Sequence, residues 1–128
     1  MKKTILKCVL VGSICLSAYS IPSDGLAANV PCSTAKLIVP WKAGGGTHVL
    51  FSIFEKTIAK LDIKPKLKVV TIPGQGGNKG AKEASKAKPD GCTLFAIHQS
   101  AFTSHLNGRI NFHYDAFDPV ALLTDTPD

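Results

Sequence analysis

Short apolar runs separated by turn residues recur along the sequence. Residues 36–40, 67–72 and 93–97 are dominated by leucine, valine, isoleucine and phenylalanine. Runs of this length and composition predict buried β-strands. Residues 119–123, which read PVALL, predict a further strand near the carboxyl end.

Apolar residues between the first two runs recur with the period of an α-helix instead. The positions on this face are Val49, Leu50, Ile53, Phe54, Thr57, Ile58 and Leu61. Thr47 is the N-cap candidate, and the helix is predicted to end near Leu61. A second helix is predicted after the glycine-rich turn at 73–78. Its apolar face consists of Ala81, Ala84 and Ala87.

The order strand, glycine loop, helix, strand, glycine loop, helix, strand predicts an α/β fold with a parallel sheet and flanking helices. Right-handed crossovers place every strand-to-helix loop at the carboxyl edge of such a sheet, where open α/β sheets bind ligands. Three loops are expected there: 43–47, 73–78 and the segment from His98 to Ser100. With 128 residues, the chain has the size of one domain.

The two glycine loops predict an anion site. A glycine loop that leads into a helix exposes backbone N–H groups without an intrahelical partner, next to the positive end of the helix dipole. Two such loops side by side suit a carboxylate or a phosphate, because glycine lets the ligand approach the backbone closely. The alternative is that the glycines only permit tight turns.

The phosphate motifs of enzymes do not match this sequence. A P-loop requires Gly-Lys followed by Ser or Thr, whereas Lys79 lies between Asn78 and Gly80. Lys79 also occupies the place of the third glycine of a dinucleotide fingerprint. Ser100 lies near His98 in sequence, which does not by itself indicate a catalytic pair. A nucleotide- or phosphate-using enzyme therefore remains only an alternative, and we expect no catalytic residues.

Other ligand classes are not favoured by composition either. The chain has a formal net charge of +6, but its lysines carry no interleaved aromatic residues and no groove-reading motif, so we expect no nucleic-acid partner. No tight spacing of metal ligands is present, and we expect no metal or cofactor. The histidines considered for a metal site are His48, His98, His105 and His113.

The amino-terminal residues predict an export signal over residues 1–28. Lys2 and Lys3 precede an apolar run from Ile5 to Ala18, which is shorter than a membrane-spanning helix requires. Cleavage could follow either Ser20 or Ala27. The expected mature part, residues 29–128, is then a soluble periplasmic protein with no stable membrane anchor.

Four segments together resemble the tripartite tricarboxylate transporter receptors, also called Bug receptors. The similar family motifs are LIVPFPAGGGTD, PGAGGNIG, PDGYTL and FAPVALL. Their counterparts are LIVPWKAGGGTH at 37–48, PGQGGNKG at 73–80, PDGCTL at 89–94 and FDPVALL at 117–123. The resemblance covers nearly everything after the leader, and four motifs in the same order are a specific signal.

The resemblance implies a type II periplasmic binding fold, in which two lobes close on a ligand and deliver it to a membrane permease. It also implies small carboxylates as ligands. The implied ligand-binding positions are Ala43, Gly44, Gly45, His48, Gly76, Gly77, Asn78, His98, Gln99 and Ser100. Residues 29–128 would form only part of the first lobe, with the second lobe absent. A truncated, non-functional fragment of such a receptor is therefore an alternative.

Two further expectations follow from the resemblance. The family fold places the first and third strands side by side and parallel, so Cys32 and Cys92, each just before one of these strands, could form a disulfide. His48 replaces the acidic residue that usually ends the first loop, which favours purely anionic ligands over ligands that carry an ammonium group.

Overall fold

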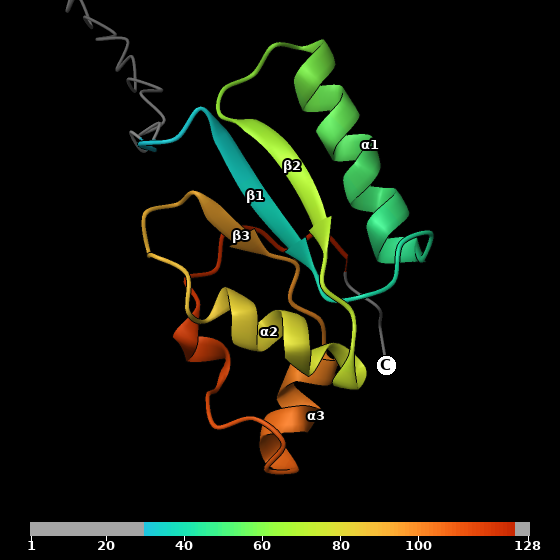
Figure 1. Cartoon of the computed structure of the whole chain (residues 1–128), viewed down its shortest axis with the longest axis vertical. Coiled ribbons are helices and arrows are strands. Elements are labelled where there is room, and N and C mark those ends of the chain that lie inside the picture. Colours follow the sequence, from blue (N-terminus) through green and yellow to red (C-terminus); the bar gives the residue numbers. More distant parts are fainter. Residues whose placement is uncertain (1–29, 125–128) are drawn as a thin grey trace, which may run out of the picture.

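The computed structural model describes residues 30–124 and has the expected α/β architecture (Figure 1). In chain order the elements are β1 (Thr34–Val39), α1 (Gly46–Lys60), β2 (Lys66–Thr71), the 3-10 helix η1 (Gln75–Gly77), α2 (Asn78–Ala84), β3 (Thr93–Phe95), α3 (Ser100–Leu106) and the 3-10 helix η2 (Tyr114–Ala116). The described part contains a three-stranded parallel sheet in the order β2-β1-β3. The predicted export signal lies outside the described residues.

The central strand β1 supplies most of the core. Ile38 and Val39 have no exposed surface, because β1 is flanked by a strand on each side. A cluster of buried side chains lies along the sheet, and partly buried apolar side chains pack against it. Its members are Leu37, Val39 and Ala96, with Trp41, Phe51, Leu67, Val69 and Leu94 around them. Burial of these apolar side chains is the main driving force that holds the sheet together.

Helix α1 covers the β2 side of the sheet with only part of its apolar surface. Phe51 packs against the core cluster, but no residue of α1 is fully buried. Val49 and Ile53, four residues apart on α1, and Leu61, directly after its end, are 49%, 57% and 63% exposed. The helix therefore carries a second apolar ridge on its outer side, and nothing in residues 30–124 covers it.

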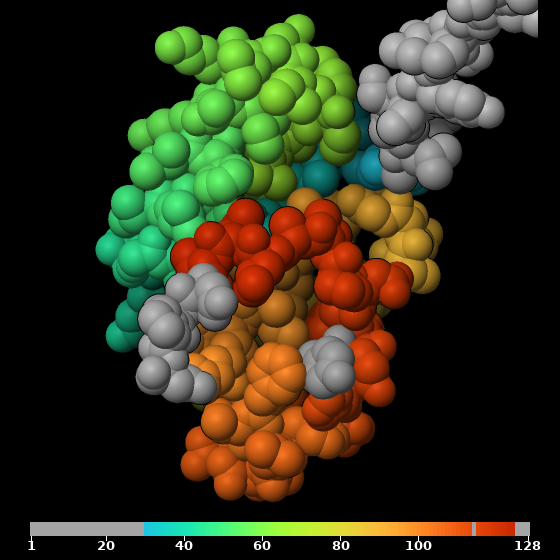
Figure 2. Space-filling model, turned by 180° about the vertical axis from the view of Figure 1, so that it is seen from behind, coloured from blue at the N-terminus to red at the C-terminus, as the bar shows by residue number. Residues whose placement is uncertain are grey.

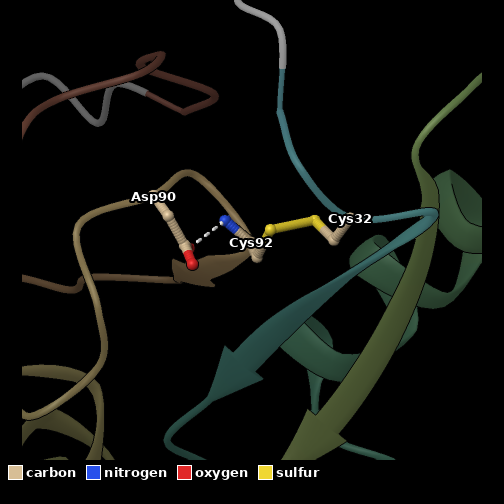
Figure 3. The surroundings of a disulfide bond; sticks show 3 residues. All are labelled: Cys32, Asp90 and Cys92. Carbon is tan, nitrogen blue, oxygen red and sulfur yellow. Dashed lines mark hydrogen bonds between the residues drawn. A yellow bond between two sulfur atoms is a disulfide. The ribbon is translucent and has the colours of Figure 1, made fainter.

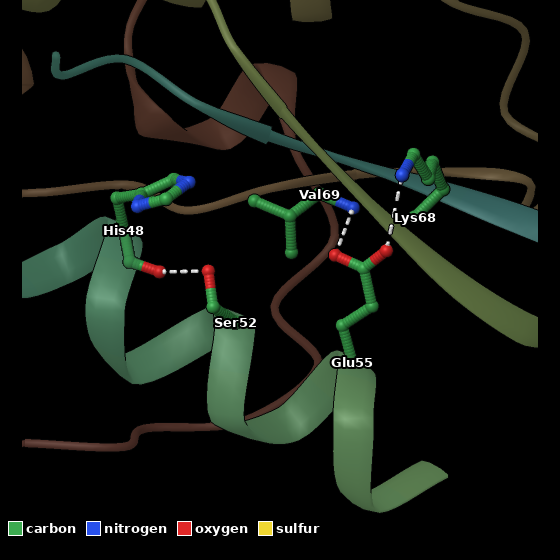
Figure 4. Close-up of polar contacts among 5 residues, drawn as sticks. All are labelled: His48, Ser52, Glu55, Lys68 and Val69. Carbon is green, nitrogen blue, oxygen red and sulfur yellow. Dashed lines mark hydrogen bonds and ion pairs between the residues drawn. The ribbon is translucent and has the colours of Figure 1, made fainter. Parts of the chain in front are cut away.

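The free edge of β2 is protected by a side chain from α1 (Figure 4). Glu55 Oε2 accepts a hydrogen bond from the Val69 backbone N–H at 3.2 Å, and its Oε1 lies 3.3 Å from Lys68 Nζ. The Val69 amide has no strand partner on this side, since β2 is an outer strand. Glu55 thus satisfies an edge amide that another chain could otherwise pair with.

Helix α2 approaches the strand ends closely at a glycine. A Cβ built on Gly80 would lie 2.9 Å from Pro40 Cβ and 3.0 Å from the Ile72 carbonyl oxygen. Ala81 and Ala84 are buried, as the predicted apolar face requires, whereas Ala87 lies beyond the end of the helix. Small residues therefore let α2 lie directly on the ends of β1 and β2.

Cys32 and Cys92 form a disulfide, with their Cα atoms 5.9 Å apart (Figure 3). The pairing matches the one that the family resemblance implied. It links the segment before β1 to the start of β3, beside the hydrogen bond from Lys36 N to the Cys92 carbonyl. The Cys92 N–H also donates to Asp90 Oδ1 at 2.9 Å, which closes the turn before β3. The amino end of the sheet is thereby fixed covalently.

The start of α1 differs from the sequence prediction. Thr47 was expected to cap the helix, but it lies inside α1, and Gly45 occupies the N-cap position with extended backbone angles. The Gly45 carbonyl accepts the first helical hydrogen bond, from Val49 N at 2.9 Å. The helix thus starts earlier than predicted, and its N-cap glycine offers no side chain to bind the first-turn amides.

The region after β3 contains the other differences. The strand predicted for 93–97 ends at Phe95, where the Ile97 N–H donates to the Phe95 carbonyl and bends the chain. Ser100, predicted to lie in a loop, is the first residue of α3. Helix α3 has only seven residues and ends before the next glycine, Gly108, which explains why no clear period revealed it.

The strand predicted for 119–123 does not form. Val120 and Leu122 are 80% and 82% exposed, and the segment is irregular. Figure 2 shows the chain after η2, in red, crossing between the green α1 side and the orange α3 side. Pro119 cannot donate a ladder hydrogen bond, and β3 offers only three residues to pair with, so the described part of the sheet provides no suitable partner.

Candidate functional site

The three loops that follow the strands meet at the carboxyl edge of the sheet. In Figure 1 all three strands run toward the same end of the molecule, and the chain leaves them into α1, into η1 and α2, and into α3. The parallel pairing of β1 with both neighbours fixes this arrangement. None of the three helices has an acidic residue in its first turn, so no carboxylate there repels an anion.

The first loop uses two of its glycine amides internally. The Gly45 N–H donates to the Lys42 carbonyl at 3.2 Å, and the Gly44 N–H donates to Nδ1 of His48, also at 3.2 Å. Ala43, Gly44 and Gly45 are all exposed. The amides with no helical acceptor therefore belong to the first turn of α1, which starts at Gly46.

His48 lies on the side of α1 that faces β2, half-buried (Figure 4). The His48 carbonyl accepts a hydrogen bond from Ser52 Oγ at 2.7 Å. Nδ1 of the His48 ring accepts the hydrogen bond from the Gly44 N–H in the preceding loop. A ring nitrogen that accepts a hydrogen bond carries no proton. The hydrogen bond from the Gly44 N–H therefore requires an Nδ1 without a proton.

The second loop turns tightly before α2. The Gly77 N–H donates to the Gly74 carbonyl at 3.0 Å, and Gly77 takes a left-handed conformation with φ +94°. Gly76 is exposed, whereas Gly77 and Asn78 are buried, with Asn78 only 4% exposed. Of the three residues that the resemblance assigned to a ligand, Gly76 is thus the one open to solvent.

The third loop reaches the other two through an aromatic contact. His98 and Gln99 are exposed, and the ring of His98 lies edge-on to the indole of Trp41, with 5.6 Å between the ring centroids. A Cβ built on Gly77 would lie 3.6 Å from both Ser100 Oγ and Trp41 Cη2. Residues from the ends of all three strands therefore come together around Trp41.

Trp41 was not among the predicted ligand-binding residues. The sequence did contain a signal for it, because Trp41 directly follows the proline that ends the first strand and precedes the glycine loop. In the structure Trp41 packs against the two neighbouring loops.

The geometry gives no support to a Ser100–His98 catalytic pair. His98 Nδ1 accepts a weak hydrogen bond from the Ser100 backbone N–H at 3.4 Å, and not from the hydroxyl group. The rings of the other two histidines, His105 and His113, contact each other, with 4.9 Å between their centroids. Among residues 30–124, no group of three potential metal ligands is arranged to hold an ion.

An open depression lies away from the three loops, near the amino end of β3. It is lined by Lys36, Glu83, Lys86, Ala87, Lys88, Asp90, Cys92 and Thr93. Three lysines there are offset by two carboxylates, and Asp90 already binds the Cys92 amide. This lysine depression is the alternative binding place for an anion, besides the three loops.

No helix of the described residues is both long and apolar enough to cross a membrane.

Comparison with known proteins finds a distant relative of the chain. The chain is 25% identical over 112 residues to the "UPF0065 protein in gbd 5'region" of Cupriavidus necator. The alignment covers 88% of this chain but 32% of the relative, so the chain spans about a third of the length of the protein it matches. No family model matches the chain.

UPF0065 is the family of the tripartite tricarboxylate transporter receptors, and it consists of binding proteins rather than enzymes. The similarity therefore agrees with the resemblance of the four motifs at the level of the family. The similarity identifies neither a ligand nor a transporter partner.

Proposed function

We propose that this chain belongs to an extracytoplasmic solute-binding receptor that captures small carboxylates and delivers them to a membrane permease of the tripartite tricarboxylate type. The proposal is supported by the four motifs, the similarity to a UPF0065 protein and the meeting of the three loops at one edge of the sheet. The observation that carries it is the cluster of Trp41, Gly77 and Ser100, one residue from each loop.

The ligand carboxylate would bind to backbone amides. The amides at the start of α1 are the natural donors in the first loop, because those of Gly44 and Gly45 already have acceptors. In the second loop, the exposed Gly76 lets a ligand approach the backbone without meeting a side chain. His98 and Gln99, both exposed, would border the ligand on the third side. Such a site recognises charge and shape and performs no chemical reaction.

Trp41 would form a wall of the same site and provides a reporter for it. It is the only tryptophan of the chain and it contacts the third loop directly. Export to the periplasm with removal of the signal, and the handover to a permease, belong to this proposal. Because the chain spans about a third of its relative, the closing second lobe also belongs to the proposal.

Intrinsic fluorescence of Trp41 tests the proposal. We expect saturable changes on titration with succinate, citrate or glutamate at constant ionic strength, and none with sodium chloride or ATP. In His98→Ala both the affinity for the same carboxylate and the spectral response should change, because the ring that borders the ligand and contacts the indole is gone. Saturation by ATP and not by any carboxylate would favour the enzyme alternative. No response to any carboxylate, also by calorimetry, would contradict the proposal.

A further inference from the structure

The hydrogen bond from Gly44 to His48 stands out because the loop has few other restraints. Three consecutive glycines, Gly44 to Gly46, precede the body of α1, and glycine loses more conformational entropy on ordering than any other residue. The N-cap residue is itself a glycine, so no side chain caps the helix. Thr47, the nearest residue with a capping hydroxyl, lies inside the helix.

His48 restrains the loop in a different way from a cap. It lies in the first turn of α1 and reaches back four residues to the Gly44 N–H. A second loop contact, from the Gly45 N–H to the Lys42 carbonyl, closes the chain just before it. Together the two bonds tie the glycine loop to the helix, and only one of them depends on a side chain.

We propose that His48 is a positioning residue, whose neutral imidazole holds the first loop closed on α1 by accepting the Gly44 amide at Nδ1. The side chain does not cap the first-turn amides of α1; it fixes the loop that precedes them. It achieves this without adding a negative charge. Any side chain with an acceptor atom bonded to its Cγ should close the loop in the same way, because this atom takes the place of Nδ1.

The absence of charge has a consequence for ligands, which rests on the proposed function. A carboxylate at position 48 would accept the same amide but would repel a carboxylate ligand bound at the start of α1. The imidazole closes the loop and leaves the local charge unchanged. We therefore expect fully anionic ligands to bind better to the natural protein and to His48→Asn than to His48→Asp, by about fivefold for a site this exposed.

Nuclear magnetic resonance on the uniformly ¹⁵N-labelled full chain tests the loop closure without any ligand. We expect a scalar coupling across the hydrogen bond between the Gly44 amide nitrogen and His48 Nδ1. We also expect slow exchange of the Gly44 amide in the natural protein and in His48→Asn. Exchange should be about fivefold faster in His48→Ala and His48→Gln, since a typical hydrogen bond has a net worth of about 1 kcal/mol. The glutamine variant is the matched control, because its oxygen lies one bond farther out.

Two results would overturn the proposal. One is an absent coupling at a pH where His48 is neutral, and the other is equal Gly44 exchange in the natural protein and His48→Ala. The Cys32–Cys92 disulfide and the Trp41 spectrum report whether each variant keeps its fold. A titration of the Asp and Asn variants with succinate then addresses the ligand. If the loop closes as expected but no variant binds succinate or citrate, the proposed function fails while the role of His48 stands.

Discussion

Gly77 is the residue at which the second loop touches both of the others. Its φ of +94° is left-handed, which costs a residue with a Cβ about 1–2 kcal/mol. Gly76 has a left-handed φ of +64° as well, but a Cβ there would meet nothing within 4 Å. The two positions therefore separate backbone strain from contact with Trp41.

We predict that Gly76→Ala and Gly77→Ala lower the free energy of unfolding by similar amounts, about 1–2 kcal/mol. Only Gly77→Ala should also shift the emission of Trp41, because its new methyl group would lie 3.6 Å from the indole. Urea unfolding and fluorescence spectra measure both effects. Equal spectra for the two variants would show that Gly77 does not contact Trp41.

Asp62, at the exposed turn after α1, provides a test of local electrostatics. The hydrogen bond from Lys64 Nζ, at 2.9 Å, lowers the pKa of the Asp62 carboxyl group, and the charges of Lys64 and Lys66 lower it further. A folded-state pKa below the unfolded one contributes stability above the unfolded pKa. This contribution is lost as the pH falls through the folded pKa.

We therefore predict that a carboxyl NMR titration finds the pKa of Asp62 below its ordinary value, and that Lys64→Met raises it toward that value. The effect on the free energy of unfolding should be small, because both side chains are exposed. An unchanged pKa in Lys64→Met would contradict the hydrogen bond.

At the scale of elements, the position of α2 depends on one close approach. The Cβ of an alanine at position 80 would come within 3.0 Å of Pro40 Cα and of the Ile72 carbonyl, which are backbone atoms that cannot rotate away. We predict that Gly80→Ala lowers the free energy of unfolding by about 1–3 kcal/mol, as overpacking does in other cores. The higher helix propensity of alanine recovers only part of this loss.

Lys82→Ala is the matched control for this prediction, because Lys82 lies on the exposed side of the same helix. Its unfolding free energy should change by less than about 0.5 kcal/mol. Thermal or urea unfolding measures both variants. If Gly80→Ala is as stable as Lys82→Ala, α2 does not lie against the strand ends.

The elements also show which predictions the sequence supports. The first two strands were predictable because each is a continuous apolar run, such as 36–40. The end of α1 was predictable because its apolar residues recur at helical spacing up to Leu61. The strand at 119–123 was not, since a strand needs a partner edge, and no pattern within the segment reports whether one exists. Helix α3 was missed because seven residues span only two turns.

The candidate site was predictable to a similar degree. Glycine loops after parallel strands must meet at one edge, so the location followed from the topology. The internal use of the Gly44 and Gly45 amides did not follow, because hydrogen bonds within a loop depend on its exact conformation. Trp41 was missed for the same reason: its contacts join residues from three separate parts of the chain.

At the scale of the whole molecule, the uncovered apolar surface is the main feature. The ridge of Val49, Ile53 and Leu61 is about half exposed or more, and surfaces of this kind favour association. We predict that the isolated chain self-associates as its concentration rises, as sedimentation velocity can show. Ile53→Gln should weaken association without a change in the fold. A single monomeric species at all concentrations would contradict this prediction.

The central claim is that a carboxylate binds where the three loops meet, and a map of amide chemical-shift changes during titration with succinate or citrate tests it most directly. The account predicts that the largest shifts lie at residues 44–48, 76–78 and 98–100. The Trp41 indole N–H should move with the same saturation curve. Shifts centred instead on Lys36, Lys86 and Lys88 in the lysine depression, or no saturable shifts at all, would contradict it.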